Sequence, residues 1–369
     1  MINEEEKMYK QYKLVFILAI LTIIIFSFFF AILYPLFIQN IDDRNYKKFL
    51  AGGPEIYLPK KHDLTWYQNV IFNQINELSF EKNVILIGGS TTSAGVLPDY
   101  NLTNNWTLYN FGMAANTVYS DKIMLNYIDN YANHKLNKND VVIFHIWHAY
   151  FVDTPPESDF TRQVIENSGI YRVDDSGNIT GHMTNLQKIL VLKKFQANFF
   201  YSMDQSKILQ STIDIIKNLD IPNKSSNNLN LNTSGPNEQT LKEYEKGWSD
   251  YTRNTTYPNN STAEFEELIL QVNNQTNVVI VNLYTPSWLH NSSKEQEYER
   301  WLESDLRPFL EEEHIPWIDF SSSIPDSEYG DSAHLFKSGR ERYTKLFNNE
   351  INKILFNITT NQLVEKKWG

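Results

Sequence analysis

Short apolar runs separated by stretches of helical spacing dominate the pattern of the chain from residue 84 onward. The runs cover residues 84–87, 106–111, 141–147, 278–284 and 315–320. Each is too short for a helix and rich in β-branched or aromatic side chains, which indicates buried strands. Segments between them, such as 117–133, carry apolar residues at intervals of three and four and predict helices. Alternating strands and helices predict an α/β fold, a three-layer α/β/α arrangement with a five-stranded parallel sheet.

The longest apolar run, residues 14–38, contains no charged side chain. About 20 apolar residues suffice for a helix to cross a bilayer, so this run predicts one transmembrane helix. A cleaved signal peptide is the rival interpretation, but its apolar region would be shorter and would end at small residues.

The orientation of this helix does not follow from charge, since three lysines precede it and three basic residues soon follow it. Asn-x-Ser/Thr sequons, among them Asn101, Asn105 and Asn254, are frequent after it and suit an exported domain. We therefore expect a single-pass protein of the cell membrane. Residues 1–13 form a cytoplasmic tail, and the catalytic domain is extracytoplasmic.

The remaining chain divides by composition. Residues 39–79 are expected to form a connector and a leading amphipathic helix, residues 80–357 the main domain, and residues 358–369 a C-terminal tail. Residues 151–260 read as an insertion. Its first half has helical spacing between 186 and 219, which favours an added core layer over a mobile lid. Its second half, 221–260, is dense in Asn, Ser and Pro and predicts a loose surface excursion.

Two parts of the chain carry candidate chemistry. Ser90 follows Gly88 and Gly89 at the carboxyl end of the first strand, where ligands gather in open α/β sheets. Taken alone, this stretch favours a plain strand-to-helix turn whose serine or threonine caps the next helix. Asp331 stands three residues before His334, ahead of a final helix that a capping box at 338–341 predicts to begin there. An aspartate so placed can orient the imidazole as a base for a serine.

Taken together, residues 88–95, 110–117 and 331–334 resemble the conserved blocks of the SGNH hydrolase superfamily, also called GDSL-like esterases and lipases. The resemblance implies a flavodoxin-like sheet and a triad of Ser90, His334 and Asp331. The family has a glycine whose backbone N–H joins the oxyanion hole, and the resemblance aligns Ala115 with that glycine.

The third block departs from the family. Where the family has Gly-x-Asn-Asp, this chain reads Ile146-Trp-His-Ala-Tyr150, so that Ala149 stands near the position of the oxyanion asparagine. The resemblance then implies that His148 or Asn116 replaces that donor, or that the enzyme has a specialised reaction. The alternatives are a buried core histidine for His148 and a helix cap for Asn116.

Charge and composition exclude several function classes. The formal net charge is −11 and no long basic run occurs, which argues against a nucleic-acid partner. The chain contains no cysteine, which excludes disulfides, thiolate metal sites and a cysteine nucleophile. Neither His145 nor His148 has a carboxylate at ligand spacing, so the sequence predicts no metal site and no cofactor.

A single span followed by such a domain also resembles membrane-anchored SGNH proteins of cell-envelope acyl transfer, which implies a multispanning membrane acyltransferase as partner. The sequence thus predicts a membrane-anchored extracytoplasmic serine esterase or O-acyltransferase. Its expected substrates are acylated cell-surface glycans or glycolipids. The alternative is a non-catalytic scaffold or glycan-binding component, which the missing asparagine supports and the Ser90, Asp331 and His334 pattern opposes.

Overall fold

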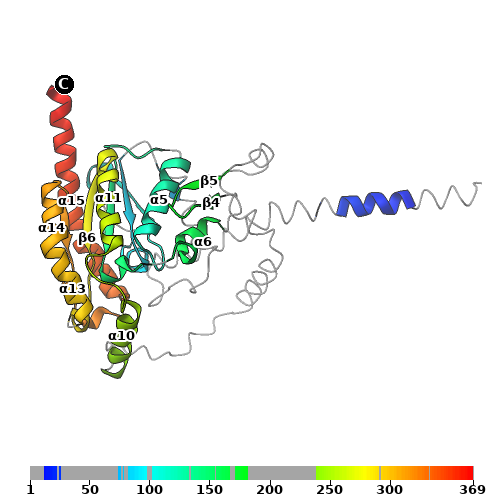
Figure 1. Cartoon of the computed structure of the whole chain (residues 1–369). Helices are drawn as coiled ribbons and strands as arrows, with labels where there is room; N and C mark the ends of the chain where they lie inside the picture. The colour runs from blue at the N-terminus through cyan, green and yellow to red at the C-terminus, as the bar shows by residue number, and fades with distance from the viewer. Residues whose placement is uncertain are drawn as a thin grey trace, which may run out of the picture.

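The structure is a computed structural model, shown in Figure 1. It describes residues 12–22, 25, 74–75, 78, 82–97, 102–132, 134–153, 155–166, 171–181, 238–290, 292–331 and 333–368; for 361–368 it describes the backbone alone. Within these residues, five strands form one parallel sheet in the order β2-β1-β3-β6-β7. The strands are β1 (Asn83–Ile87), β2 (Thr107–Asn110), β3 (Val141–Ile146), β6 (Asn277–Asn282) and β7 (Trp317–Asp319).

The sheet confirms the predicted fold class. The chain starts in the middle of the sheet, adds β2 on one side and then adds β3, β6 and β7 in turn on the other. This is the flavodoxin-like order, in which the direction of growth reverses between β1 and β3. Each of the five strands lies within or beside one of the five apolar runs, because buried parallel strands need apolar side chains on both faces.

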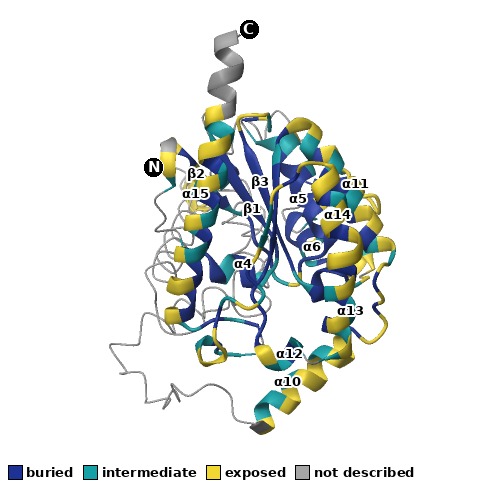
Figure 2. Cartoon of the chain, turned by 90° about the vertical axis from the view of Figure 1, so that its left-hand side faces the viewer, coloured by how far each residue is buried: buried dark blue, intermediate teal, exposed yellow. Residues whose placement is uncertain are grey.

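Helices cover both faces of this sheet, as Figure 2 shows. Ile85 and Ile87 of β1 pack in one core with α5 (Val118–Tyr131), α11 (Asn260–Gln275) and α14 (Arg307–Glu312). Val84 and Leu86 point to the opposite face, into a core with α15 (Lys337–Trp368). Successive side chains of a strand alternate between faces, so one run of four apolar residues serves both layers.

The predicted transmembrane helix falls largely on residues outside the described part of the chain. Residues 12–22 and 25 are helical. Among the described residues, none of the helices combines the length and the apolar character that a bilayer span requires. The span 14–38 therefore stays a prediction. Of the predicted connector and leading helix, only residues 74, 75 and 78 are described, and the first two are helical.

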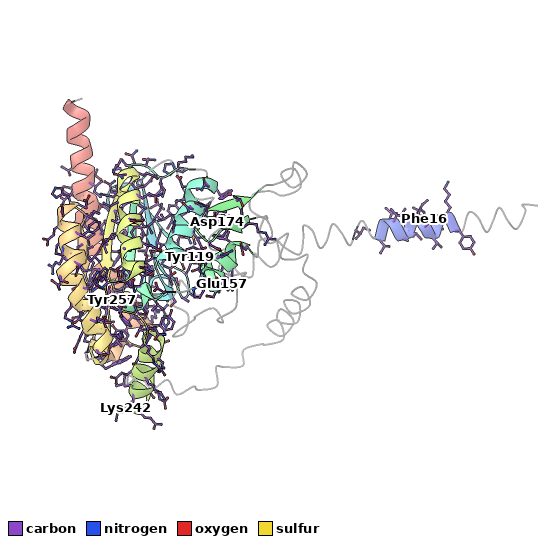
Figure 3. The ribbon with its side chains drawn as sticks, viewed as in Figure 1. Phe16, Tyr119, Glu157, Asp174, Lys242 and Tyr257 are labelled. Carbon is purple, nitrogen blue, oxygen red and sulfur yellow. The ribbon has the colours of Figure 1, made fainter. Side chains whose placement is uncertain are left out.

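Part of the predicted insertion is an ordered layer of the domain. It contains α6 (Phe160–Glu166) and an antiparallel hairpin of β4 (Tyr171–Val173) and β5 (Ile179–Gly181). The hairpin docks on α5, where the Tyr119 hydroxyl donates to the carbonyl of Asp174 at 2.8 Å (Figure 3). The helical pattern predicted between 186 and 219 lies outside the described residues.

The prediction of a loose excursion over 221–260 is wrong for its last part. Residues 238–251 form the helix α10 (Glu238–Tyr251), and residue 260 already begins α11. The Asn259 side chain accepts the N–H of Thr262 and caps α11, so an asparagine counted as a loop signal is a helix start. In α10 the rings of Tyr244, Trp248 and Tyr251 recur at helical spacing, which the average composition of the segment concealed.

Two predictions about the end of the chain are also wrong. The final helix begins at Lys337, with the N–H of Arg340 bonded to the carbonyl of Phe336, so Ser338 lies inside the helix and is not its cap. The Ser338 hydroxyl instead donates to the carboxylate of Glu328. Residues 358–368 continue α15 and do not form a separate tail.

Candidate active site

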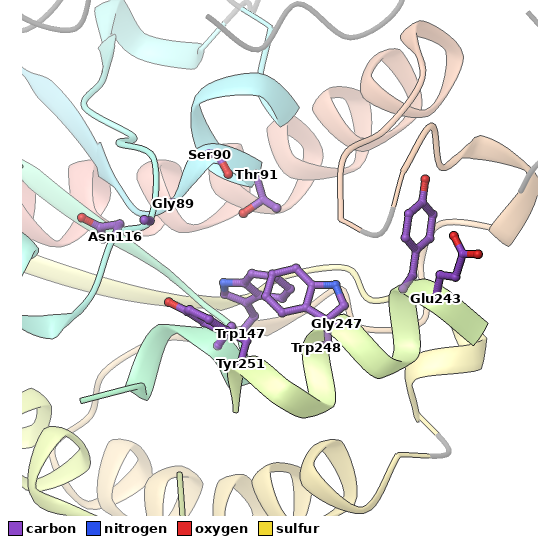
Figure 4. Close-up of a pocket in the computed structure, with 12 residues that line it drawn as sticks. Gly89, Ser90, Thr91, Asn116, Trp147, Glu243, Gly247, Trp248 and Tyr251 are labelled. Atoms are coloured by element: carbon purple, nitrogen blue, oxygen red, sulfur yellow. The ribbon is translucent and has the colours of Figure 1, made fainter. Parts of the chain in front are cut away.

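Ser90 begins the short helix α4 (Ser90–Gly95) directly after the turn at the carboxyl end of β1. The turn is crowded. A Cβ atom at Gly88 would lie 2.2 Å from the Thr92 hydroxyl oxygen and 2.8 Å from the Cβ of His145. Only glycine fits there. The chain therefore reverses sharply and presents Ser90 at the edge of the sheet (Figure 4).

The structure brings Ser90, His334 and Asp331 together as the sequence predicts. The Nε2 atom of His334 lies 2.9 Å from the Oγ atom of Ser90. The Nδ1 atom of the same ring lies 2.9 Å from each carboxylate oxygen of Asp331. An ionised carboxylate can only accept hydrogen bonds, so Nδ1 carries the proton and the lone pair of Nε2 faces the Ser90 hydroxyl.

Asp331 is held in its ionised form by its surroundings. Burial raises the pKa of its carboxyl, but the hydrogen bond and charge of His334 and the backbone N–H groups of Ala333 and His334 outweigh burial and lower it below the ordinary value. Both N–H groups donate to Oδ1 at 2.8 Å. The loop also closes on itself, since the N–H of Gly330 donates to the carbonyl of His334 at 2.8 Å. The imidazole is thus oriented before any ligand arrives.

The loop after β2 packs directly against the Ser90 turn. A Cβ atom at Gly112 would lie 2.5 Å from the backbone nitrogen of Ser93, so only glycine permits this approach. Asn110 fastens the loop, because its amide donates to the carbonyl of Thr92 at 3.1 Å and accepts the N–H of Gly112 at 3.0 Å. The next residues of this loop, Ala115 and Asn116, reach the cavity beside Ser90.

Ala115 adopts a conformation that favours glycine. Its φ angle is 50°, in the left-handed region, where a Cβ atom costs about 1 kcal/mol or more. The resemblance to the SGNH hydrolases implies a glycine at this position. The backbone here keeps the conformation that a glycine would adopt without strain.

Asn116 lines the cavity, but its side-chain amide is already hydrogen-bonded to a buried carboxylate. Its Nδ2 donates to a carboxylate oxygen of Asp121 at 2.5 Å, and the Tyr150 hydroxyl donates to the other oxygen at 2.5 Å. Asp121 is fully buried. Burial raises its pKa from 3.8 to about 7, although the two hydrogen bonds act in the opposite direction. The buried carboxyl therefore fixes Asn116 and, with it, the neighbouring Ala115.

His148 is not brought to Ser90. Its imidazole is buried at the start of the short helical turn His148–Phe151, packs against Trp248 and Tyr298, and does not line the cavity. Its neighbours Trp147 and Ala149 line the cavity instead. The sequence prediction of His148 as an oxyanion donor thus lacks the geometry it needs, because the ring points into the protein.

His145 contacts the helix that begins at Ser90 through a hydrogen bond with Thr92. Its Nδ1 atom lies 3.1 Å from the hydroxyl oxygen of Thr92. Burial lowers its pKa to about 3, so the ring is neutral at physiological pH. It is a buried hydrogen-bonding residue of the core.

A cavity of about 400 Å³ opens in front of Ser90, at the carboxyl ends of β1, β2 and β3. Helix α10 forms its outer wall, which the sequence analysis missed. Trp147 and Trp248 meet edge to face with ring centroids 4.8 Å apart, across the cavity from Ser90 (Figure 4). The described lining residues include no lysine or arginine, and Glu243 is their one charged member. They are Gly89, Ser90, Thr91, Ala115, Asn116, Trp147, Ala149, Glu243, Tyr244, Gly247, Trp248 and Tyr251.

No protein-family model and no curated protein matches the chain. Among solved structures it is similar to a member of the lipolytic protein G-D-S-L family from Veillonella parvula. The identity is 11%, the TM-score 0.31, and the match covers 72% of this chain and 94% of that one. It is also similar to a mutant acetyl-xylooligosaccharide esterase from Geobacillus stearothermophilus, at 11% identity and a TM-score of 0.32, over 74% of this chain and 94% of that one. Likeness this low carries no argument about fold, activity or substrate.

Proposed function

We propose that this chain is a serine esterase or O-acyltransferase that uses Ser90 as its nucleophile. The observation that supports this most strongly is the hydrogen-bonded chain from Ser90 through His334 to Asp331, with both ring contacts at 2.9 Å, at the mouth of a cavity. A serine is a weak nucleophile by itself and needs an oriented base. These three side chains meet that need.

In the proposed reaction, Ser90 Oγ attacks the ester carbonyl while His334 Nε2 takes the hydroxyl proton. Asp331 stabilises the imidazolium that forms. When the tetrahedral intermediate collapses, His334 returns the proton to the leaving alcohol and the acyl group stays on Ser90. Water or a sugar hydroxyl then attacks the acyl-enzyme while His334 takes its proton. When this second intermediate collapses, the bond from the acyl carbon to Ser90 Oγ breaks, His334 returns the proton to Oγ, and the acid or new ester leaves.

The backbone N–H groups of Ser90 and Ala115 are the proposed oxyanion donors. Both residues line the cavity. The imidazole of His148 is directed away from it, and the amide of Asn116 is bound to Asp121. Removal of one donor from an oxyanion hole lowers the rate by about 10²- to 10³-fold, so a hole of two backbone donors implies a modest rate on unspecific esters.

The aromatic wall supports acylated glycans or glycolipids as substrates. Rings of Trp147, Tyr244 and Trp248 line the cavity. Flat aromatic faces suit the apolar faces of sugar rings, and the described lining residues include no basic side chain that would favour acidic groups there.

We further propose that the chain is anchored in the cell membrane through residues 14–38, with the Ser90 domain outside the cytoplasm. The apolar run and the sequons after it support this placement. Protease added to intact cells should then digest the chain after residue 40, and full protection would reverse the orientation. A multispanning membrane acyltransferase is the proposed partner, which would supply or receive the acyl group.

Hydrolysis of an aryl acetate by the purified full chain tests the esterase proposal. We expect steady release of the phenol by the wild type and its loss in Ser90→Ala, whereas Ser304→Ala, an exposed serine, serves as the matched control. A folded wild type whose turnover equals that of Ser90→Ala would favour the scaffold alternative.

A further inference from the structure

The cavity in front of Ser90 has two chemically different ends. Figure 4 shows Asn116 at one end and Glu243 of α10 at the other, with Ser90 between them. The first end belongs to the loop of Ala115, whose backbone N–H is a proposed oxyanion donor. A substrate that fills the cavity therefore places one portion of its ester near Asn116 and the other portion near Glu243.

The end at Glu243 is on the side of the base. Tyr244, the next residue of α10, also lines the cavity. Burial raises the pKa of its hydroxyl above the ordinary value, and the charges of Asp331 and Glu243 add to the rise, so Tyr244 lies near both carboxylates. His334, which Asp331 orients, returns a proton to the leaving alcohol in the proposed reaction. The alcohol portion of the ester therefore lies at the Glu243 end.

This end combines one carboxylate with several aromatic rings. Among the described lining residues, Glu243 is the one charged side chain. Tyr244 and Trp248 are four residues apart and so are neighbours on the surface of α10. The rings of Trp248 and Trp147 meet at an interplanar angle of 78° and form a corner of the cavity wall. Because ring faces attract cations within about 6 Å of their centroids, rings beside a carboxylate suit an ammonium group.

Gly247 leaves room beside Glu243. It follows Glu243 by one helical turn, so the two residues are neighbours on α10, and both line the cavity. A Cβ atom at Gly247 would have no other atom within 4 Å. A glycine inside a helix lowers its stability relative to alanine, which gives this position no structural advantage. The open space next to the carboxylate suits a branched head group such as a substituted ammonium.

We propose that the cavity takes esters whose alcohol portion carries an ammonium group, which Glu243 and the rings of Tyr244 and Trp248 bind. Esters of amino sugars and of amino alcohols belong to this class. The inference rests on the proposed esterase or O-acyltransferase function and narrows its substrates. The formal net charge of −11 also favours the approach of cations to the chain.

Acetylcholine and 3,3-dimethylbutyl acetate test the charge at constant shape, because a carbon replaces the charged nitrogen in the second ester. The kcat/KM of the purified full chain is divided by the rate constant of hydroxide hydrolysis of the same ester, which removes the difference in intrinsic reactivity. We expect the corrected value to be about tenfold higher for acetylcholine. This preference should fall several-fold in Glu243→Gln. It should persist in the control Glu245→Gln, at an exposed position of α10 outside the cavity lining.

A second pair of esters tests which portion carries the ammonium group. The ethyl esters of trimethylglycine and of 3,3-dimethylbutanoic acid place the same two groups on the acyl side. We expect the corrected preference between these two esters to be the same in the wild type and in Glu243→Gln. A preference that depends on Glu243 for the acyl-side pair and not for the alcohol-side pair would overturn the proposal.

Binding to Ser90→Ala separates this inference from the proposed chemistry. Choline and its neutral isostere 3,3-dimethylbutanol are titrated into the full-length variant, with tryptophan fluorescence as the readout because Trp147 and Trp248 line the cavity. We expect choline to bind about tenfold more tightly, and the addition of Glu243→Gln to remove most of this difference. Circular dichroism checks that each variant is folded.

The two measurements together tell the two proposals apart. A chain that turns over no ester but prefers choline would contradict the proposed function and support the ammonium site. Equal affinity of folded Ser90→Ala for choline and for 3,3-dimethylbutanol would overturn the ammonium site, whether or not the wild type hydrolyses esters.

Discussion

His334 Nε2 lies 2.9 Å from Ser90 Oγ, although 244 positions separate the two residues in the chain. The packing of α15 produces this contact. Tyr343 and Phe347 of α15 lie in the same buried cluster as Val84 and Leu86 of β1, so the loop that carries His334 ends beside the turn that carries Ser90. The geometry of the proposed triad therefore depends on packing at one face of the sheet.

Replacement of Asp331 by asparagine should leave the fold intact and nearly abolish activity. An amide in this place can donate to Nδ1 and so turns the imidazole to the tautomer that cannot accept the Ser90 proton. We expect turnover of an aryl acetate to fall by about 10⁴-fold, with an unchanged melting temperature. The exposed variant Asp305→Asn is the control. An Asp331→Asn enzyme with near wild-type turnover would remove Asp331 from the mechanism.

Asp121 should make the stability of the domain depend on pH. Burial raises its pKa from 3.8 to about 7, with the charge of Asp159 adding to the shift. The folded state thus binds more protons than the unfolded state between these values, and this contribution to stability falls as the pH rises from about 4 to about 7. Urea unfolding at several pH values should show a flatter dependence for Asp121→Asn over that window. Parallel pH profiles of the two proteins would contradict the assignment.

Replacement of Ala115 by glycine should keep stability and turnover, whereas replacement by valine should lower both. Glycine adopts a φ angle of 50° freely, so Ala115→Gly should keep its turnover and change the free energy of unfolding by less than about 1 kcal/mol. A β-branched residue is disfavoured there, and Ala115→Val should lose about 1–3 kcal/mol of stability together with turnover. Turnover equal to wild type in Ala115→Val would show that this N–H is no oxyanion donor.

Trp248→Ala should weaken substrate binding more than it weakens chemistry. The ring forms part of the cavity wall and meets Trp147, a contact of a kind that contributes about 0.5–1.5 kcal/mol. We expect KM for an acylated sugar to rise about tenfold, with kcat changed little, because Ser90 and His334 keep their places. Lys246→Ala, on the exposed side of α10, is the control. A fall in kcat with constant KM would assign Trp248 to the reacting centre instead.

The strands and the triad were predictable because local pattern determines them. Runs such as 84–87 are apolar at every position, as strands buried on both faces must be, and Gly88 and Gly89 mark the turn before Ser90. Asp331 and His334 interact within one loop, so their spacing, together with a serine after the first strand and a helix after the loop, carries the signal. The helix predicted over 117–133, which the structure has as α5, was predictable for the same reason, since its apolar residues recur at intervals of three and four.

Other features depend on contacts that no local pattern reveals. Helix α10 lies in a segment whose asparagines and serines outnumber its apolar residues, and its rings matter only because Trp147 lies opposite. The apparent capping box at Ser338 fails because Glu328, ten residues earlier, takes its hydroxyl. The sequence suggests His148 as a substitute oxyanion donor, but the ring pairs with Glu295, distant in the chain, and does not line the cavity.

Covalent labelling of the full chain by a fluorophosphonate tests the central claim most directly. Phosphonylation imitates the tetrahedral intermediate and so requires both an activated serine and an oxyanion site. Mass spectrometry should find the label on Ser90 in the wild type, none in Ser90→Ala, and strongly slowed labelling in His334→Ala. A folded wild type, tested both purified and in native membranes, that shows no label on Ser90 would contradict the proposed nucleophile.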